Sequence, residues 1–222
     1  GGATLQYTGA GSSSNRVINL TNSGGIVDAS GSGALTLSGG VTGNAQNLTL
    51  TGSGSGTESG VINTTTGTVT KAGSGTWTLS GNNNYTGATN SNAGTLAVTA
   101  NNALGTNAVG TTVASGATLD FRNVAYSTTE AVALNGGTLA ASTGTSSFAG
   151  PVTLGANSNV DVASTQLTLS GVIGGAGFGI AKQGSGTLVL SGTNTYNGAT
   201  NINAGMLTAS GGNAISDASQ VN

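Results

Sequence analysis

The amino-acid sequence predicts an all-β protein whose strands form a parallel β-helix, or β-solenoid, of about ten rungs. Three observations lead to this prediction: apolar residues in closely spaced pairs, glycine-rich turns between the pairs, and an insertion the size of one complete strand and turn. Together they favour a stack of similar coils over a sandwich, a barrel or a disordered chain.

The predicted strands are short, because the apolar residues come in pairs two positions apart. Side chains alternate across a strand, so each pair points to one face while the neighbouring Thr, Ser or Asn points outward. No apolar pattern keeps helical spacing for three turns, and glycines mark the corners between pairs. The predicted strand pairs are Leu35/Leu37, Leu48/Leu50, Trp77/Leu79, Leu96/Val98, Leu119/Phe121, Val132/Leu134, Val152/Leu154, Val160/Val162, Leu167/Leu169 and Leu188/Leu190.

A long internal repeat organises the chain. Residues 71–96 recur at residues 182–207, with 18 of 26 positions identical at an offset of 182 − 71 = 111. We expect one β-helix segment over residues 1–222, with repeat copies of approximately 1–111 and 112–222. Because the pattern is cut at both ends, we expect a segment of a longer array. The positions expected to be structural are Lys71, Gly73, Gly75, Trp77, Leu79, Gly81, Tyr85, Gly87, Gly94, Leu96, Lys182, Gly184, Gly186, Leu188, Leu190, Gly192, Tyr196, Gly198, Gly205 and Leu207.

An insertion in the repeat favours the solenoid over other β folds. The similar segments "ALTLSGG" and "QLTLSGV" align Leu35 with Leu167, an offset that exceeds that of the main repeat by the length of one strand and turn. The inserted stretch lies between Gly40 and Gly60 and carries its own strand pair, Leu48/Leu50. An added strand changes the closure of a sandwich or barrel, whereas a stacked coil gains a rung without disturbing the others.

The composition fits a stack of rungs and excludes several functions. Glycine accounts for 41 of 222 residues and only 5% are charged, which suits rungs about 4.8 Å apart, where stacked like charges would repel. The chain has no cysteine and no histidine, so it lacks thiolate ligands and the commonest general base. Its four cations are scattered, which argues against a nucleic-acid partner. No cofactor or metal is expected.

Both copies resemble the passenger-associated β-strand repeat of bacterial autotransporters. The shared pattern is a Lys, a Gly-x-Gly-Thr-Leu-x-Leu-Ser-Gly strand, an Asn-x-Tyr-x-Gly turn and Asn-Ala-Gly-x-Leu; Trp77 departs where leucine is usual. The resemblance implies a right-handed β-helical passenger exported through the outer membrane of a Gram-negative bacterium and displayed at the cell surface or released. It also implies a translocator barrel as a partner, expected on the same parent chain beyond this sequence.

Few side chains suggest chemistry. Among the six carboxylates, the best constellation is Asp120, Arg122 and Glu130. Asp120 and Arg122 would share a strand face, so we interpret them as an ordinary surface ion pair, with a catalytic or sugar-binding role as the alternative. Lys71 and Lys182 share one repeat position, which indicates a structural or solvated role. The remaining carboxylates are Asp28, Glu58, Asp161 and Asp217.

The aromatic residues of the repeat are expected to be structural. Tyr85 and Tyr196 are interpreted as anchors that stack over a glycine corner, and Trp77 as a core residue. The glycine-rich stretch 174–182 superficially resembles a calcium nonapeptide, but Gly179 stands where a metal-binding Asp should be.

These observations favour a non-catalytic surface scaffold, a stalk or adhesin segment, and not an enzyme. A self-assembling filament or surface-layer subunit and a part of a carbohydrate-active β-helix protein remain as alternatives. A host or cell-surface ligand and self-association are open as partners.

Overall fold

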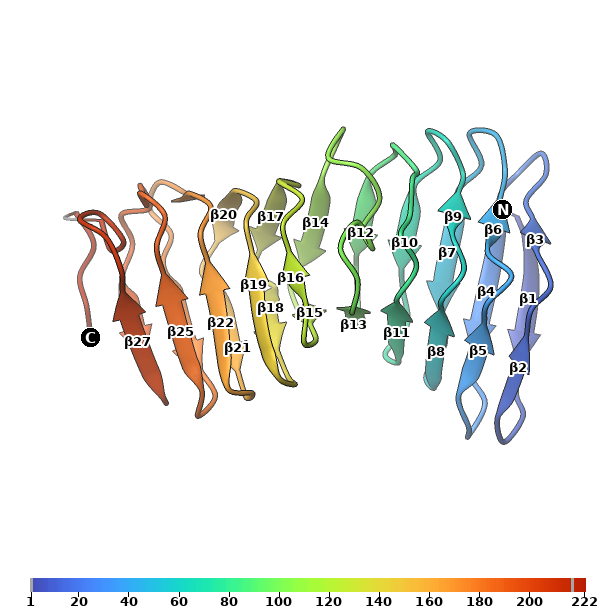
Figure 1. Cartoon of the computed structure of the whole chain (residues 1–222), viewed down its shortest axis with the longest axis horizontal. Helices are drawn as coiled ribbons and strands as arrows, with labels where there is room; N and C mark the ends of the chain where they lie inside the picture. The colour runs from blue at the N-terminus through green and yellow to red at the C-terminus, as the bar shows by residue number, and fades with distance from the viewer. Residues whose placement is uncertain (1, 217) are drawn as a thin grey trace.

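The computed structural model describes residues 2–216 and 218–222, so Asp217 lies outside the described residues. The chain forms an elongated rod with its termini at opposite ends (Figure 1). Its described residues contain 27 strands and no helix, and every ladder between named strands is parallel. The predicted all-β solenoid of about ten turns is therefore confirmed.

Three faces run along the rod, and each turn of the chain contributes a strand to most of them. The first face is a nine-stranded sheet of β1 (Ala3–Tyr7), β4 (Gly25–Ala29), β7 (Leu48–Thr51), β10 (Val69–Lys71), β12 (Thr89–Ser91), β14 (Thr111–Ala114), β17 (Val132–Asn135), β20 (Val152–Ala156) and β23 (Ile173–Gly174). The second is a ten-stranded sheet of β2 (Ser12–Ser14), β5 (Leu35–Leu37), β8 (Ser55–Glu58), β11 (Thr76–Leu79), β13 (Gly94–Val98), β15 (Ala117–Phe121), β18 (Thr138–Ala141), β21 (Ser158–Val162), β24 (Ile180–Gln183) and β26 (Thr200–Ile202).

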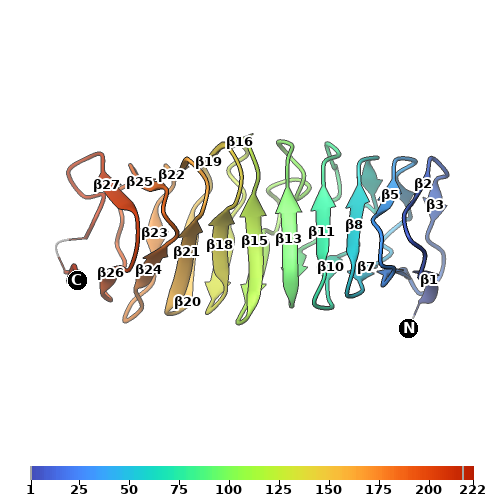
Figure 2. The same cartoon turned by 90° about the horizontal axis from the view of Figure 1, so that it is seen from below.

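The third face is interrupted. It consists of a three-stranded sheet, β3 (Ile18–Asn19), β6 (Val41–Thr42) and β9 (Ile62–Asn63), and a five-stranded sheet, β16 (Ala125–Tyr126), β19 (Thr145–Phe148), β22 (Gln166–Leu169), β25 (Thr187–Leu190) and β27 (Met206–Ala209). Between these sheets the chain passes the third face twice without forming a strand, after β11 and after β13. Figure 2 shows the second face, where the strands from β5 to β24 lie side by side.

The core is a set of apolar columns inside the rod. All ten predicted apolar pairs lie in strands and are buried. Parallel register stacks equivalent positions of successive turns, so that Leu96 pairs with Leu119 and Leu119 with Leu139. The inward side chains of the alternating pattern predicted from the sequence thus fill the interior of the rod.

The insertion adds one complete turn, as predicted. It supplies β6, β7 and β8, one strand for each face, and Val41 pairs directly with Ile62 of the next turn. The turn length is regular, because five turns carry Val69 to Ile173 through Thr89, Thr111, Val132 and Val152. The chain therefore uses about 21 residues per turn.

The repeat offset is not a whole number of turns. Five turns from Val69 end at Ile173, whereas the repeat counterpart of Val69 is Ile180, about one face further along the chain. Accordingly, β10 and β12 lie in the first face, whereas their counterparts β24 and β26 lie in the second. The second copy is therefore placed one face further around the rod than the first.

Candidate functional site: the repeat corner

A buried lysine holds the corner between two strands in each copy of the repeat. Lys71 ends β10, is fully buried, and donates from Nζ to the carbonyl oxygens of Ala72 (2.7 Å), Gly73 (2.8 Å) and Ala93 (2.9 Å). Ala93 belongs to the next turn, so the ammonium joins two turns. The solvated role left open for this lysine is wrong.

Lys182 repeats the arrangement in the second copy. Its Nζ donates to the carbonyl oxygens of Gln183 (2.5 Å), Gly184 (2.8 Å) and Ala204 (3.0 Å), and it is also fully buried. The same three acceptor positions therefore recur although the second copy lies one face further around the rod. We call each set, Lys71 or Lys182 with its three carbonyls, the lysine clamp.

Burial and hydrogen bonding act in opposite directions on the clamp. Desolvation lowers the pKa of Lys71 to about 8. Desolvation also lowers the pKa of Lys182, while the charge of Asp161 opposes this shift. Since carbonyl oxygens can only accept hydrogen bonds, three of them around Nζ favour the ammonium form. With a pKa of about 8, Lys71 is protonated at neutral pH.

Glycine is required where the clamp closes. Gly94 has φ +61° and Gly205 has φ +69°, in the region that favours glycine. A Cβ at Gly205 would lie 2.9 Å from Lys182 Nζ. The next turn can reach the ammonium only because this residue has no side chain.

The other repeat glycines allow close approach of consecutive turns. A Cβ at these positions would lie about 2 Å from backbone atoms of the preceding turn, which no side chain tolerates. They are Gly75, Gly81, Gly87, Gly186, Gly192 and Gly198. The remaining predicted positions are corner glycines with positive φ, Gly73 and Gly184, and inward leucines, Leu79, Leu96, Leu188, Leu190 and the partly buried Leu207.

Buried asparagines connect three turns, which the sequence did not reveal. Asn83 Oδ1 accepts from Ile62 N (2.8 Å), and its Nδ2 donates to Ala103 O (2.6 Å). Asn194 does the same with Ile173 N (2.7 Å) and Ala214 O (2.5 Å). The prediction that asparagine faces outward is wrong here. Each of these turns lacks a strand on one face, and we call them the irregular turns. The asparagine amides supply the hydrogen bonds that the missing strand would have made.

Asn83→Ala is expected to lower the free energy of unfolding by about 2 kcal/mol, since two buried backbone groups lose their partner. Urea denaturation of the parent protein and of Asn83→Ala measures the difference. The exposed neighbour Asn82 provides the control, and Asn82→Ala should change stability by less than about 0.5 kcal/mol. Equal effects of the two substitutions would contradict the bridging role.

The repeat tyrosines anchor the same irregular turns. Tyr85 is buried with its hydroxyl 2.7 Å from Thr89 Oγ1, and Tyr196 pairs with Thr200 at the same distance. A Cβ at Gly105, on the next turn, would lie 2.8 Å from the Tyr85 ring. Burial raises the pKa of both tyrosines, so they stay protonated. The first tyrosine thus packs over a glycine.

Trp77 fills the space left by a glycine in the preceding turn. It is fully buried and pairs in register with Gly56, where a Cβ would lie 2.5 Å from the indole ring. Its Nε1 donates to Thr51 O (2.8 Å). In the second copy, Leu188 pairs with Leu167 instead. A tryptophan and a glycine in the first copy thus correspond to two leucines in the second.

The carboxylate constellation is not assembled. Asp120 binds Arg122 Nε at 2.6 Å and accepts from Ser142 N (3.0 Å) and Oγ (2.7 Å). Glu130 instead accepts from Thr111 Oγ1 and from the Tyr126 hydroxyl. The Asp120 side chain is 3% exposed, so the interpretation as an ordinary surface pair is wrong for the carboxylate.

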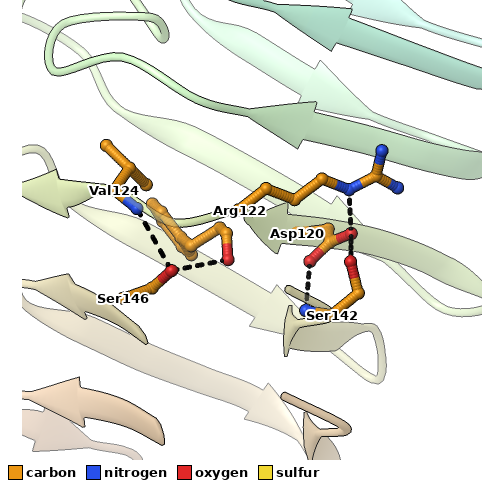
Figure 3. Close-up of polar contacts among 6 residues, drawn as sticks. Asp120, Arg122, Val124, Ser142 and Ser146 are labelled. Atoms are coloured by element: carbon orange, nitrogen blue, oxygen red, sulfur yellow. Dashed lines mark hydrogen bonds and ion pairs between the residues drawn. The ribbon is translucent and has the colours of Figure 1, made fainter. Parts of the chain in front are cut away.

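Asp120 acts as a connection between turns (Figure 3). Its two oxygens hold the start of the corner after β18, and Ser146 nearby accepts from Val124 N (3.3 Å) and donates to Phe121 O (2.8 Å). The serines thus support the corners of this part of the rod. Nothing in the geometry joins Asp120 and Glu130 as an acid and base pair.

Glu58 is a buried carboxyl that the sequence analysis did not single out. It lies in an inward column between Leu37 and Leu79. One oxygen accepts from Gly60 N (2.9 Å), while Oε2 has no partner among the described residues. Burial raises the pKa of Glu58 to about 7, and burial also raises the pKa of Glu130 to about 7.

These carboxyls should make the rod more stable in acid. Between pH 4.5 and about 7 the unfolded chain loses the Glu58 proton while the folded chain keeps it, so the free energy of unfolding falls as pH rises. Over this pH range Glu58 lowers the free energy of unfolding by about 3 kcal/mol, at about 1.36 kcal/mol per pH unit. Glu58→Gln should therefore be more stable than the parent at pH 8 and nearly equal to it at pH 4, as measured by urea denaturation. An unchanged pH slope would contradict this.

Neither a metal centre nor a membrane helix is found in the described part of the chain. Residues 2–216 and 218–222 contain no cluster of three or more His, Asp or Glu side chains that could hold a metal ion. The same residues contain no helix long and apolar enough to cross a membrane.

Comparison with known proteins identifies the repeat. The family model of the passenger-associated-transport-repeat matches residues 69–98 and 180–209, which correspond to β10 through β13 and β24 through β27. The chain carries two passenger-associated transport repeats. Each transport repeat contains one lysine clamp, one buried asparagine and one tyrosine anchor.

One related protein is an adhesin. Over 55 residues the chain is 54% identical to the adhesin BmaC autotransporter of Brucella suis biovar 1 (strain 1330), which covers 23% of this chain and 2% of that protein. The chain thus spans only a small part of the length of this relative. No solved structure matches the chain.

Proposed function

We propose that the chain is a non-catalytic rod in the passenger of an autotransporter, where it acts as a stalk or scaffold for an adhesin. The observation that carries the proposal is the pair of transport repeats, supported by the similarity to an autotransporter adhesin. Both support export through the outer membrane of a Gram-negative bacterium to the cell surface or beyond. A translocator barrel on the same parent chain is the partner this route requires.

The side chains of the repeats fit a mechanical role. The lysines bind backbone carbonyls of the next turn, and Asp120 holds a corner of the next turn, so these charged groups are engaged in joining turns. A rod of about ten turns at about 4.8 Å per turn is on the order of 50 Å long. Such a segment would hold the parts beyond it at a fixed distance from the membrane.

Surface display tests the proposal. The chain, placed between an export signal with an epitope and a translocator barrel, is expected to reach the cell surface, where added protease removes the epitope from intact cells. The purified chain is expected to leave a panel of polysaccharides uncleaved. Retention in the periplasm would contradict the passenger role, and polysaccharide cleavage that is lost in Asp120→Ala would contradict the non-catalytic role.

A further inference from the structure

The interruption of the third face forms a polar hollow on the surface of the rod. It lies along this interruption, where two successive turns form no strand on the third face, and it has a volume of about 640 Å³. Its lining includes Val61, Asn82, Asn84, Thr106, Asn107 and Thr129. We call this surface the polar hollow.

The lining carries no charge. All its residues are Asn, Thr, Ser, Gly or Val. The carboxyl of Glu130, which follows Thr129 in the chain, points inward to Thr111 and Tyr126. A charged ligand would therefore find no counter-charge to offset its lost hydration, whereas a neutral ligand needs only hydrogen bonds.

Several polar groups in the hollow are free to bind. Asn82 and Asn84 are exposed, and their side-chain amides make no hydrogen bond to the described residues. The hydroxyl of Thr106 is covered but has no partner among those residues. A rotation that turns this hydroxyl toward the hollow would break no hydrogen bond.

The frame around these groups is held firmly. Asn83, between the two free asparagines, is buried and bonded to the turns on both sides. Asn101 Oδ1 accepts from the backbone N–H groups of Ser127 (2.9 Å) and Thr128 (3.2 Å), which fixes the chain next to Thr129. A preformed frame lowers the entropic cost of binding.

We propose that the polar hollow binds a neutral oligosaccharide. Each amide offers both donors and an acceptor, which matches the adjacent hydroxyls of a sugar ring. Val61 is 45% exposed beside them and supplies an apolar contact for the C–H face of the ring. The volume is within the range of small-ligand sites and suits a short glycan. This inference goes beyond the stalk role and does not depend on it.

The test begins with the full chain on an array of neutral, sialylated and sulfated oligosaccharides. The neutral glycan retained there is then titrated calorimetrically. Asn84→Ala and Asn107→Ala are each expected to weaken binding about tenfold, the effect of losing one good hydrogen bond. The exposed Asn203 lies outside the hollow, so Asn203→Ala should bind as the parent does.

Folding and ligand class are checked separately. Each variant should keep the β circular-dichroism spectrum and melting temperature of the parent, and Thr106→Val, which preserves shape, should weaken binding without lowering stability. The proposal is overturned if no neutral glycan binds at millimolar concentration or if only charged glycans or peptides bind. It is equally overturned if the hollow variants bind as well as Asn203→Ala.

Discussion

Replacing Gly56 with leucine is expected to lower the free energy of unfolding by about 4 kcal/mol, because the new side chain would occupy the space of the Trp77 indole. Even a Cβ at Gly56 would lie 2.5 Å from that ring. Trp77→Leu alone should cost about 2 kcal/mol through the cavity it leaves. Denaturant unfolding of both single variants gives the two values.

The double variant is the informative one. Gly56→Leu with Trp77→Leu reproduces the Leu167 and Leu188 pair that the second repeat already uses. We expect the double variant to be about 3 kcal/mol more stable than the sum of the single effects predicts. Thr57→Leu, at the partly exposed neighbouring position, serves as the control with little effect. Additive single effects would show that the two positions do not share one space.

Lys71→Met is expected to lower the free energy of unfolding by about 4 kcal/mol, because three carbonyl oxygens lose a charged donor in a buried corner. Methionine keeps most of the apolar stem, so the loss reports on the ammonium. Urea denaturation at pH 7 measures it, where Lys71 is protonated.

Two comparisons make this result specific to the clamp. Thr70→Val changes the adjacent, partly exposed position and should leave stability within about 0.5 kcal/mol of the parent. Lys182→Met removes the equivalent donor of the second repeat and should also destabilise. A stable Lys71→Met protein would contradict the clamp as a source of cohesion between turns.

Much of the fold could be predicted because its signal is local. Apolar pairs such as Leu48/Leu50 show the period of a strand wherever they occur, and the inserted turn appears as a shift in the repeat offset. The displacement of the second repeat by one face could be recognised only from the strand register in the structure. The repeat offset alone does not give the turn length.

The polar interior could not be predicted in the same way. Lysine is rarely fully buried, so nothing local marks Lys71 as an inward residue. Asn83 lies between two exposed asparagines, so the residue type does not distinguish it. Only the missing strand on the third face explains its burial. Glu58 lies midway along the chain between Leu37 and Leu79, one turn length from each. This spacing identifies an inward position once the turn length is known.

Removing one whole turn tests the central claim that this rod is a stack of interchangeable turns. Deleting residues 41–61 joins Gly40 to Ile62, which already pairs with Val41. The deletion brings Leu35 against Trp77 in place of Gly56, so it is made together with Trp77→Leu. Deleting only residues 41–50 in the same background removes part of a turn and serves as the control.

Small-angle X-ray scattering with circular dichroism gives the measurement. The whole-turn deletion is expected to remain a folded β rod shortened by about 5 Å, one rung spacing, while the partial deletion unfolds or aggregates because its columns lose register. If the whole-turn deletion unfolds as the partial deletion does, or if both fold equally well, the solenoid turn is not the structural unit of this protein.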